Sequence, residues 1–438
     1  MIREIKNGTL YFDGCNTVDL AEKYNTPLYV VSETEIVRRF DELKDCFVNR
    51  YERTRVAYAS KAFSTLAMYK LCQREGMCID VVSGGELFTA ISCDFPAQNI
   101  EFNGNNKSYE ELEMAIDYGV GRIIVDGLTE LDMIEEICKT KAKIANVLYR
   151  ITPGVRSDSH DYIVTGRKDS KFGIPLDEHI LYPYIERAIS SPCIDFKGFH
   201  FHVGSQLHDN SSHLQALDIL LHHVTEVKRR FDCEVQELNL GGGFGVTYTD
   251  EERKPFSYFL EPMMEKIEGF FAQEGMKRPA IVIEPGRSIV AEAGISLYRV
   301  GQIKNIPDLR TYVSVDGGMT DNIRPALYGA KYSAVIAGRA DEPAETEVTI
   351  CGKCCESGDI LIKDLLLPKV EQGDILAVFS TGAYGYSMAS NYNKNPIPAV
   401  VFVKEGRSEV IVKRQTYQDL IKNEVLPERL TVAEQRTR

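Results

Sequence analysis

Eight short apolar runs recur between residues 55 and 287, and helix-like stretches separate them. One of these stretches, SYEELEMAIDYG, opens with Ser108 and carries Glu111 three residues later, which is a helix-start signal. Apolar strands that alternate with helices form parallel sheets covered on both faces. Eight such units predict an α/β fold, a (β/α)8 TIM-type barrel, which we place at residues 31–294. The runs are RVAYASK, CIDVVS, IEFNG, RIIVD, NVLYRI, FKGFHFHV, ELNLGGG and AIVIEPG.

The pattern changes after about residue 295, where turns instead of long helices join the strand-like runs. These runs are ISLYRVGQI, RTYVSVDGG, TEVTICGK, DILAVFSTG and AVVFVKEGRSEVIVKR. Near the amino terminus, TLYFDG and PLYVVS also have the composition of strands. We therefore expect a second, mostly antiparallel β-domain, a sandwich or barrel, formed by residues 295–438 and joined by the strand segment of residues 1–30.

The charge of the chain limits its partners. It has 51 Lys and Arg against 64 Asp and Glu, a formal net charge of −13. This balance argues against nucleic acid, which needs a basic surface, although a few local arginines can still bind a small anion. No apolar run approaches the roughly 20 residues that span a bilayer, and MIREIKNGTLYF lacks a signal-peptide core. With 11 scattered cysteines taken as reduced thiols, we expect a cytoplasmic protein.

Unusual residues stand where the expected barrel strands end, which is where barrel enzymes place their reactive groups. Lys61 ends the first strand, His202 and Ser205 follow the sixth, Gly241 to Gly243 the seventh, and Glu284 and Arg287 the eighth. Each has a plain structural interpretation: a surface lysine, a satisfied core histidine, a tight glycine turn, or a carboxylate in a local ion pair. The sequence of any one of them leaves both interpretations open.

Together the same residues meet the needs of one cofactor. A buried lysine can form a Schiff base, consecutive glycines at a helix start can hold a phosphate, and a histidine ring can lie against a flat ligand. Glu284 could hold a proton on a ring nitrogen. These are the requirements of pyridoxal 5′-phosphate. We expect no metal site, because Cys351 and Cys354 have CxxC spacing without a second pair.

Long motifs carry a resemblance that covers nearly the whole chain. In order they are VAYASKAFSTLAM, DVVSGGEL, NGNNKS, RITPGV, TGRKDSKFGI, HFHVGSQ, LNLGGGFG, IEPGRS, VDGGMTDNIRPALYGA, CGKCCESGD and STGAYGYSMASNYN. They resemble the motifs of the diaminopimelate decarboxylases, which belong to the fold-type III pyridoxal-phosphate enzymes with an alanine racemase-like barrel. The resemblance implies the same barrel followed by a β-domain, and a homodimer in which the β-domain contributes to the active site and the interface.

The resemblance also implies roles at the matching positions. Lys61 and Cys355 would be catalytic, Lys61 as the amine that holds the cofactor and Cys355 as a proton donor that the partner subunit supplies. The adjacent Cys354 would only pack. His200 and His160 also match family motifs. The implied cofactor-binding residues are Lys61, His202, Ser205, Gly241, Gly242, Gly243, Glu284, Gly286, Arg287 and Tyr384, and the implied substrate-binding residues are Arg287, Arg324, Tyr328, Glu356 and Tyr384.

The charges of the substrate set indicate a substrate class. Arginine forks bind carboxylates, so a site that adds Arg287 and Arg324 to Glu356 suits a far end with both a carboxylate and an ammonium. meso-2,6-Diaminopimelate has that end, and its decarboxylation gives L-lysine and CO2, the last step of lysine biosynthesis. A related decarboxylase acting on D-lysine, D-ornithine, arginine or carboxynorspermidine is the alternative. A non-catalytic relative is disfavoured because the lysine, thiol and glycines are all present.

Overall fold

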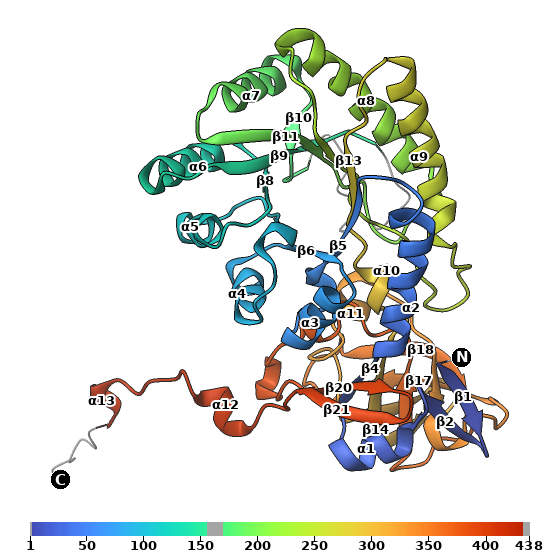
Figure 1. The fold of residues 1–438 in the computed structure, drawn as a ribbon. Helices are drawn as coiled ribbons and strands as arrows, with labels where there is room; N and C mark the ends of the chain where they lie inside the picture. The colour runs from blue at the N-terminus through green and yellow to red at the C-terminus, as the bar shows by residue number, and fades with distance from the viewer. Residues whose placement is uncertain (1, 156–169, 432–438) are drawn as a thin grey trace.

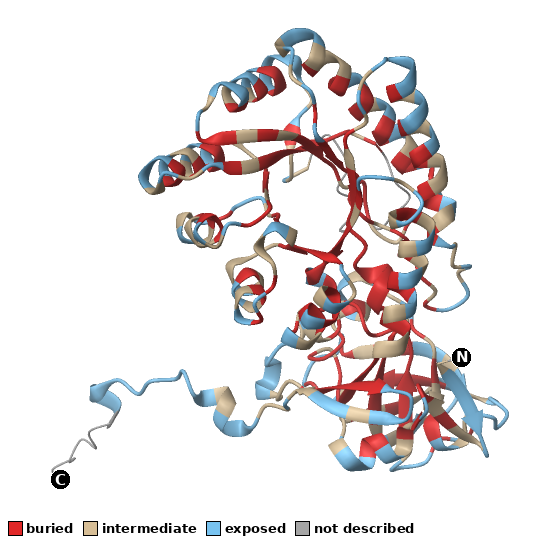
Figure 2. Cartoon of the chain, in the orientation of Figure 1, coloured by how far each residue is buried: buried red, intermediate tan, exposed pale blue. Residues whose placement is uncertain are grey.

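The computed structural model describes residues 2–155 and 170–431, which form two bodies stacked one on the other (Figure 1). The upper body in this view is a barrel of strands wrapped by helices, and the lower body is built from sheets. Buried residues run along the barrel strands and through the middle of the lower sheets, while the outer helix faces are exposed (Figure 2). Each body therefore has its own apolar interior.

Parallel strands close into a ring and confirm the expected barrel. They are β5 (Thr54–Ala59), β6 (Cys78–Val81), β7 (Ile100–Phe102), β8 (Arg122–Val125), β9 (Ala145–Thr152), β11 (Ile194–His200), β12 (Glu237–Asn239) and β13 (Ala280–Ile283). Each overlaps one of the apolar runs of the sequence. Strand β13 returns to pair with β5, and β8 pairs with β9, so the barrel has no open edge. The short β10 (Ile174–Pro175) lies parallel to β9.

Helices cover the outside of the barrel. They are α2 (Glu33–Leu43), α3 (Leu66–Arg74), α4 (Gly84–Ser92), α5 (Tyr109–Tyr118), α6 (Leu128–Lys141), α7 (Glu178–Ser190), α8 (Ser211–Phe231) and α9 (Phe256–Gln273). The short α10 (Arg287–Val290) follows β13 and is buried instead. A π-helical turn, η1 (Lys44–Val48), continues α2. Ser108 and Glu111 form the expected capping box at the start of α5. The helix then buries Leu112, Ala115 and Ile116 at helical spacing, which fixes the face that packs on the barrel.

The second body is a mostly antiparallel sheet, as expected. Its strands are β4 (Leu28–Ser32), β14 (Gly294–Ile306), β15 (Arg310–Val315), β16 (Ala334–Ile336), β17 (Thr346–Cys351), β18 (Ile360–Leu367), β19 (Ile375–Val378), β20 (Ala399–Lys404) and β21 (Arg407–Val412). Two pairings are parallel, β15 with β17 and β4 with β20. Strand β4 lies between β14 and β20, so a segment from the start of the chain completes the sheet.

Several elements of this body were absent from the sequence prediction. Residues near the amino terminus form α1 (Thr17–Tyr24), which Asn16 caps and which buries Leu20 and Ala21. Strands β16 and β18 were also missed, because AVI is short and ILIKDLLL shows no simple alternation of buried and exposed residues. The remaining elements are β1 (Arg3–Lys6), β2 (Thr9–Phe12), β3 (Cys15–Asn16), α11 (Arg324–Tyr328), α12 (Tyr417–Ile421), α13 (Glu428–Thr431) and the 3₁₀ turns η2 (Ser60–Ala62), η3 (Ala97–Asn99), η5 (Ala337–Arg339), η6 (Tyr386–Met388) and η7 (Tyr392–Lys394).

A close backbone contact joins the two bodies beside the barrel mouth. The N–H of Gly382 donates to the carbonyl of Ala291, and the N–H of Thr381 donates to that of Gly294. A Cβ added at Gly382 would lie 1.9 Å from the carbonyl oxygen of Val290, which is fixed backbone. Only glycine lets the loop that carries Tyr384 approach the barrel at this point.

We predict that Gly382→Ala lowers the free energy of unfolding by about 1–3 kcal/mol, because the added methyl group must push two backbones apart. Urea unfolding of the purified protein measures this. The matched control is Gly269→Ala in α9, where an added Cβ meets nothing within 4 Å and alanine should stabilise the helix slightly. Equal unfolding midpoints for wild type and Gly382→Ala would contradict the tight junction.

Candidate functional site

A cavity of about 710 Å³ opens at the carboxyl ends of the barrel strands. A small annex of about 50 Å³ shares several of its walls. Of the residues expected to act at this site, those lining the main cavity are Lys61, His202, Ser205, Glu284, Arg287, Arg324, Tyr328 and Tyr384. Gly243 and Gly286 line the annex. The fold thus brings together residues from opposite sides of the barrel and from the β-domain.

Lys61 projects into this cavity from the turn that follows β5. The strand ends at Ala59, and the 3₁₀ turn η2 places the lysine beyond the barrel interior. The turn is fixed on one side by Ser60, whose hydroxyl donates to Glu86 Oε2 at 2.7 Å. On the other side the N–H of Tyr384 donates to the carbonyl of Ala62 at 2.8 Å. The amine is therefore presented to the cavity by a rigid support rather than by a loose loop.

Glu284 lies buried opposite, and donors hold its carboxylate. Asn239 donates to Oε1 at 2.8 Å and Asn103 donates to the same oxygen at 3.2 Å, while His200 Nε2 lies 3.0 Å from Oε2. Burial raises the pKa of Glu284, but the neighbouring His200 and then Lys61 outweigh it, so this pKa lies below its ordinary value. A carboxylate has room for about four hydrogen bonds, and these three leave one acceptor position.

Burial raises the pKa values of two neighbouring carboxyl groups instead. Burial, and secondarily the charge of Glu284, raises the pKa of Asp80 well above its ordinary value. Burial raises the pKa of Glu101 to about 8, with Glu237 and Glu284 adding to the effect. Protonation of Glu101 at neutral pH removes one like charge from around Glu284, and the raised pKa of Asp80 acts in the same direction. The network therefore concentrates one negative charge at the position that faces the cavity.

Sequence reasoning missed the two amides that build this network. Asn103 donates to both Asp80 and Glu284, and Asn239 donates to both Glu101 and Glu284. A signal was present, since each asparagine interrupts or ends an apolar run at a strand end, in IEFNG and ELNLGGG. Their partners could not be inferred because they come from other strands of the closed barrel.

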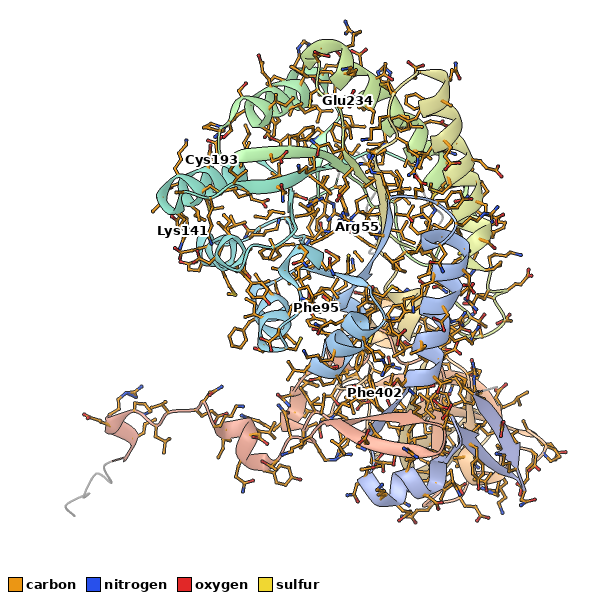
Figure 3. The ribbon with its side chains drawn as sticks, viewed as in Figure 1. Arg55, Phe95, Lys141, Cys193, Glu234 and Phe402 are labelled. Atoms are coloured by element: carbon orange, nitrogen blue, oxygen red, sulfur yellow. The ribbon has the colours of Figure 1, made fainter. Side chains whose placement is uncertain are left out.

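A second cluster of charges lies at the amino ends of the barrel strands, outside the cavity. Arg55 Nη2 lies 2.5 Å from Glu237 Oε2, and Arg122 Nη2 lies 2.8 Å from the same oxygen. Figure 3 shows Arg55 among the side chains that fill the barrel, on the strand that leads to Lys61. The two arginines neutralise Glu237, so this buried carboxylate is paired and does not compete with Glu284 for the cavity.

His202 presents a neutral ring. The N–H of Gly242 donates to His202 Nδ1 at 3.3 Å, which assigns the remaining proton to Nε2. Burial, aided by the charges of Lys61 and Arg150, holds the pKa of His202 well below its ordinary value. A neutral imidazole of fixed orientation can lie flat against an aromatic ligand without adding charge to the site.

The three glycines that follow β12, Gly241 to Gly243, have different roles. The N–H of Gly241 donates to Asn239 Oδ1 at 2.9 Å, and that of Gly242 orients His202. Of the three, only Gly243 lines the annex. A Cβ at Gly242 would lie 2.1 Å from the carbonyl oxygen of Glu284, so this loop packs directly against the strand that carries the acid. Two of the glycines thus serve close packing and orientation of neighbours.

The annex has the donors of an anion site. Its walls include Ser205, Gly243, Gly286 and Ser288. The Ser288 hydroxyl is buried and has no hydrogen-bond partner among the described residues, which is unusual for a polar group at this depth. Ser205 accepts bonds from Arg287 Nε and Nη2 at 3.2 and 3.0 Å, which brings a guanidinium to the same wall. A phosphate would supply the acceptor that Ser288 lacks.

Cys355 and Glu356 lie outside both cavities. Both side chains are exposed, and the N–H of Cys355 donates to Asn393 Oδ1 at 2.8 Å. The neighbouring Cys354 is buried, and burial raises the pKa of its thiol to about 11. The fold therefore separates these two residues from the other candidates and distinguishes the two adjacent thiols by exposure.

Some expectations concern parts of the chain that the structure does not describe. His160 and residues 165–169 of the TGRKDSKFGI motif lie outside the described residues. Within residues 2–155 and 170–431, no cluster of three or more His, Cys, Asp or Glu side chains is arranged to hold a metal ion. No helix in the same ranges is both long and apolar enough to cross a bilayer.

Comparison with known proteins identifies the family of this chain. Residues 33–291 match the family model of the pyridoxal-binding domain of pyridoxal-dependent decarboxylases. The diaminopimelate decarboxylase of Bacillus subtilis (strain 168) is 48% identical over 421 residues, which cover 96% of each chain. The enzyme of the same name from Bacillus methanolicus is 49% identical over 411 residues, 94% of this chain and 95% of its own. The chain belongs to the diaminopimelate decarboxylase family.

Solved structures agree with this family. The diaminopimelate decarboxylase from M. jannaschii, in complex with L-lysine, is 37% identical and has a TM-score of 0.92, covering 98% of both chains. The enzyme from Helicobacter pylori, also complexed with L-lysine, is 31% identical with a TM-score of 0.85 over 93% of this chain and 98% of that one. The family's barrel and sheet domain, expected from the motifs, are thereby confirmed.

The neutral carboxyl group of Glu101 predicts a pH dependence of stability. Folded protein keeps this proton up to about pH 8, whereas the unfolded chain releases it near 4.5. Between these values the folded state binds more protons, so rising pH favours unfolding. We predict that wild type loses unfolding free energy relative to Glu101→Gln as the pH rises from about 4.5 to about 8. Urea unfolding at a series of pH values measures the difference.

The matched control is Glu110→Gln, because Glu110 lies at the exposed start of α5. Its unfolding free energy should keep a constant difference from that of wild type between pH 6 and 8, where an exposed carboxyl group is already ionised. A constant difference for Glu101→Gln over the whole range would contradict a protonated Glu101.

Proposed function

We propose that this protein decarboxylates meso-2,6-diaminopimelate to L-lysine and CO2 with pyridoxal 5′-phosphate as cofactor. The observation that carries the proposal is one cavity that contains an amine, a buried ionised carboxylate and two arginines: Lys61, Glu284, Arg287 and Arg324. Relatives 44–49% identical over most of the chain are named diaminopimelate decarboxylase. The similar structures that hold L-lysine are also diaminopimelate decarboxylases.

The residues present fit pyridoxal phosphate. Glu284 has one acceptor position left for a protonated ring nitrogen, and His202 offers a neutral face. In the annex, the unpartnered hydroxyl of Ser288 and the backbone at Gly243 suit the phosphate. When bound, this cofactor accepts the electron pair left on the substrate's α-carbon as CO2 departs.

The side chains of this protein supply the other functions that the reaction needs. Lys61 would hold the cofactor through its amine, and the same amine would be available for exchange with the substrate and product amines. Glu284 would pair with the ring nitrogen, because His200 and Lys61 keep its pKa low and Asn103 and Asn239 donate hydrogen bonds to it. His202, whose ring is oriented by the N–H of Gly242, would lie against the cofactor ring.

Arginines near the β-domain suit the far end of the substrate. Arg324 is buried at the cavity wall with its guanidinium beside two tyrosine rings, and Arg287 lines the same cavity. Their forks bind the carboxylate that remains in L-lysine. Glu356 would pair with the adjacent ammonium. Since Glu356 and Cys355 are exposed and outside this chain's cavity, we propose that each site takes them from the partner subunit of a homodimer.

Cys355 then delivers the proton that replaces CO2 on the α-carbon. An exposed thiol on a loop can enter a neighbouring cavity, whereas Cys354 is buried in its own chain with a raised pKa. The proton donor of each active site would therefore come from the partner subunit. Residues 31–294 would provide the cofactor site and Arg287, and the β-domain would provide Arg324 and the loop that carries Cys355 and Glu356 to the partner's site.

We predict that Lys61→Ala abolishes the visible absorbance of the lysine-bound cofactor and reduces decarboxylation at least about a thousandfold, because no amine remains to hold and release it. Absorbance spectra and coupled lysine-release assays with meso-diaminopimelate measure the two effects. Near-normal turnover by this variant would refute the assignment. Absence of lysine release by wild type, with D-lysine or carboxynorspermidine consumed instead, would favour the alternative substrates.

We further predict that Lys61→Ala and Cys355→Ala complement each other. Each variant alone is inactive, but a mixed dimer contains one site with both native residues. Refolding or coexpression as an equal mixture should restore about a quarter of wild-type activity by random pairing in a twofold dimer. Cys354→Ala is the control and should be active by itself. A mixture as inactive as its components would show that lysine and thiol act within one chain.

A further inference from the structure

Tyr248 stands between the two arginines of the cavity, and none of the roles above uses it. It follows the glycine loop, in GGGFGVTYTD, and lines the cavity while being only 6% exposed. Its hydroxyl accepts a hydrogen bond from Arg287 Nη1 at 2.6 Å. The guanidinium carbon of Arg324 lies 4.9 Å from the centre of its ring. One side chain therefore contacts both cations: Arg287 through its hydroxyl, with the guanidinium carbon 5.9 Å from the ring centre, and Arg324 through its ring.

The contact with Arg324 leaves that residue's donors available. A cation over an aromatic face is attracted by the ring without giving up an N–H. Within the part of the chain that the structure describes, the side chain of Arg324 makes one hydrogen bond, from Nη1 to the Tyr332 hydroxyl at 2.5 Å. Tyr332 packs edge-on against Tyr248, with ring centres 5.4 Å apart at 84°. Since a guanidinium has five N–H groups, most of those on Arg324 remain for a ligand.

Arg287, in contrast to Arg324, is held by hydrogen bonds from its N–H groups. Nε and Nη2 donate to the Ser205 hydroxyl at 3.2 and 3.0 Å, and Nη1 donates to Tyr248. The bond to Tyr248 stops the guanidinium from turning wholly toward Ser205 and the annex. Loss of that hydroxyl would free one end of the fork, and the distance between the two arginines would no longer be set.

The backbone of Tyr248 is anchored on both sides. Its N–H donates to Glu251 Oε2 at 3.0 Å, and its carbonyl accepts from the Ser333 hydroxyl at 3.1 Å. The preceding carbonyl, that of Thr247, accepts from the Ser380 hydroxyl at 3.0 Å. Ser333 and Ser380 belong to the β-domain, whereas Tyr248 follows a barrel strand. The ring is thus fixed where the two bodies meet, and it can serve as a rigid spacer.

We infer that Tyr248 is a positioning residue that sets the spacing of Arg287 and Arg324, and so selects substrates whose far end carries a carboxylate. This inference rests on the proposed function, because it concerns the far end of diaminopimelate. Two cations held apart by a fixed ring form a cleft for one anion, while a freely moving pair would repel each other and separate. A substrate without that carboxylate gains nothing from the spacing.

D-Lysine is the discriminating probe. The product L-lysine keeps the carboxylate of the L centre, so the reaction occurs at the D centre of meso-diaminopimelate. D-Lysine has the same reacting end and a far ammonium, but it lacks the far carboxylate. Its binding can be followed from the change in the visible absorbance of the bound cofactor, so the comparison does not depend on turnover.

The test variant is Tyr248→Phe, which keeps the ring and removes the hydroxyl. We expect KM for meso-diaminopimelate to rise about tenfold or more, the size of one lost hydrogen bond to a charged group, with kcat within about twofold of wild type. The binding constant of D-lysine should stay within about twofold. Tyr332→Phe, which removes the hydroxyl partner of Arg324, should raise the same KM and likewise spare D-lysine.

Tyr149→Phe is the matched control, because it removes a buried tyrosine hydroxyl that bonds to the Tyr184 carbonyl at 2.8 Å, away from the cavity. It should leave both ligands unaffected. Equal weakening of diaminopimelate and D-lysine by Tyr248→Phe, or no change in either, would overturn the inference. A wild-type enzyme that fails to decarboxylate diaminopimelate would instead overturn the proposed function, so the two failures can be told apart.

Discussion

The site depends on keeping one carboxylate ionised in a buried place. Removing Glu284 from water favours its protonated form, and the neighbouring His200 and Lys61 reverse this, so its pKa lies below its ordinary value. Asn103 and Asn239 donate hydrogen bonds to the same carboxylate, and burial raises the pKa values of Asp80 and Glu101 beside it. Because Glu284 is only 7% exposed, its charge acts more strongly on its neighbours than a charge on the surface would. The closed barrel supplies the partners, since they come from several strands.

Asn239 links this charge to the rest of the cofactor site. Its amide nitrogen donates to Glu284 and Glu101, and its oxygen accepts from the N–H of Gly241. The next residue, Gly242, orients His202, and His213 supports the loop from behind through the Gly242 carbonyl at 2.9 Å. The acid, the flat ring and the start of the annex therefore share one rigid connection. Displacing any part of it would misalign the others.

Local patterns in the sequence were sufficient to predict the barrel and much of its mouth. Apolar runs and capping signals are short-range features, and strand ends in a barrel must meet at one rim, so Lys61, His202 and Glu284 could be placed in one cavity. The network partners were harder, because Asn103 and Tyr248 gain meaning only from residues far away in the chain. Helix α1 was missed for another reason: its strand-like neighbours obscured a short segment that Asn16 caps.

The loop that carries Cys354 and Cys355 shows why the sequence did not predict where these two thiols lie in the structure. Asp359 accepts hydrogen bonds from the N–H of Met319 at 2.6 Å and that of Cys354 at 2.8 Å, which pins the loop to its own domain. A Cβ at Gly352 would lie 2.2 Å from Asp359 Oδ2, so the turn is also closely packed. With its base fixed in this way, the loop exposes Cys355 and buries Cys354. A rigid, outward-facing thiol suits delivery to a second subunit, because no large rearrangement has to accompany binding.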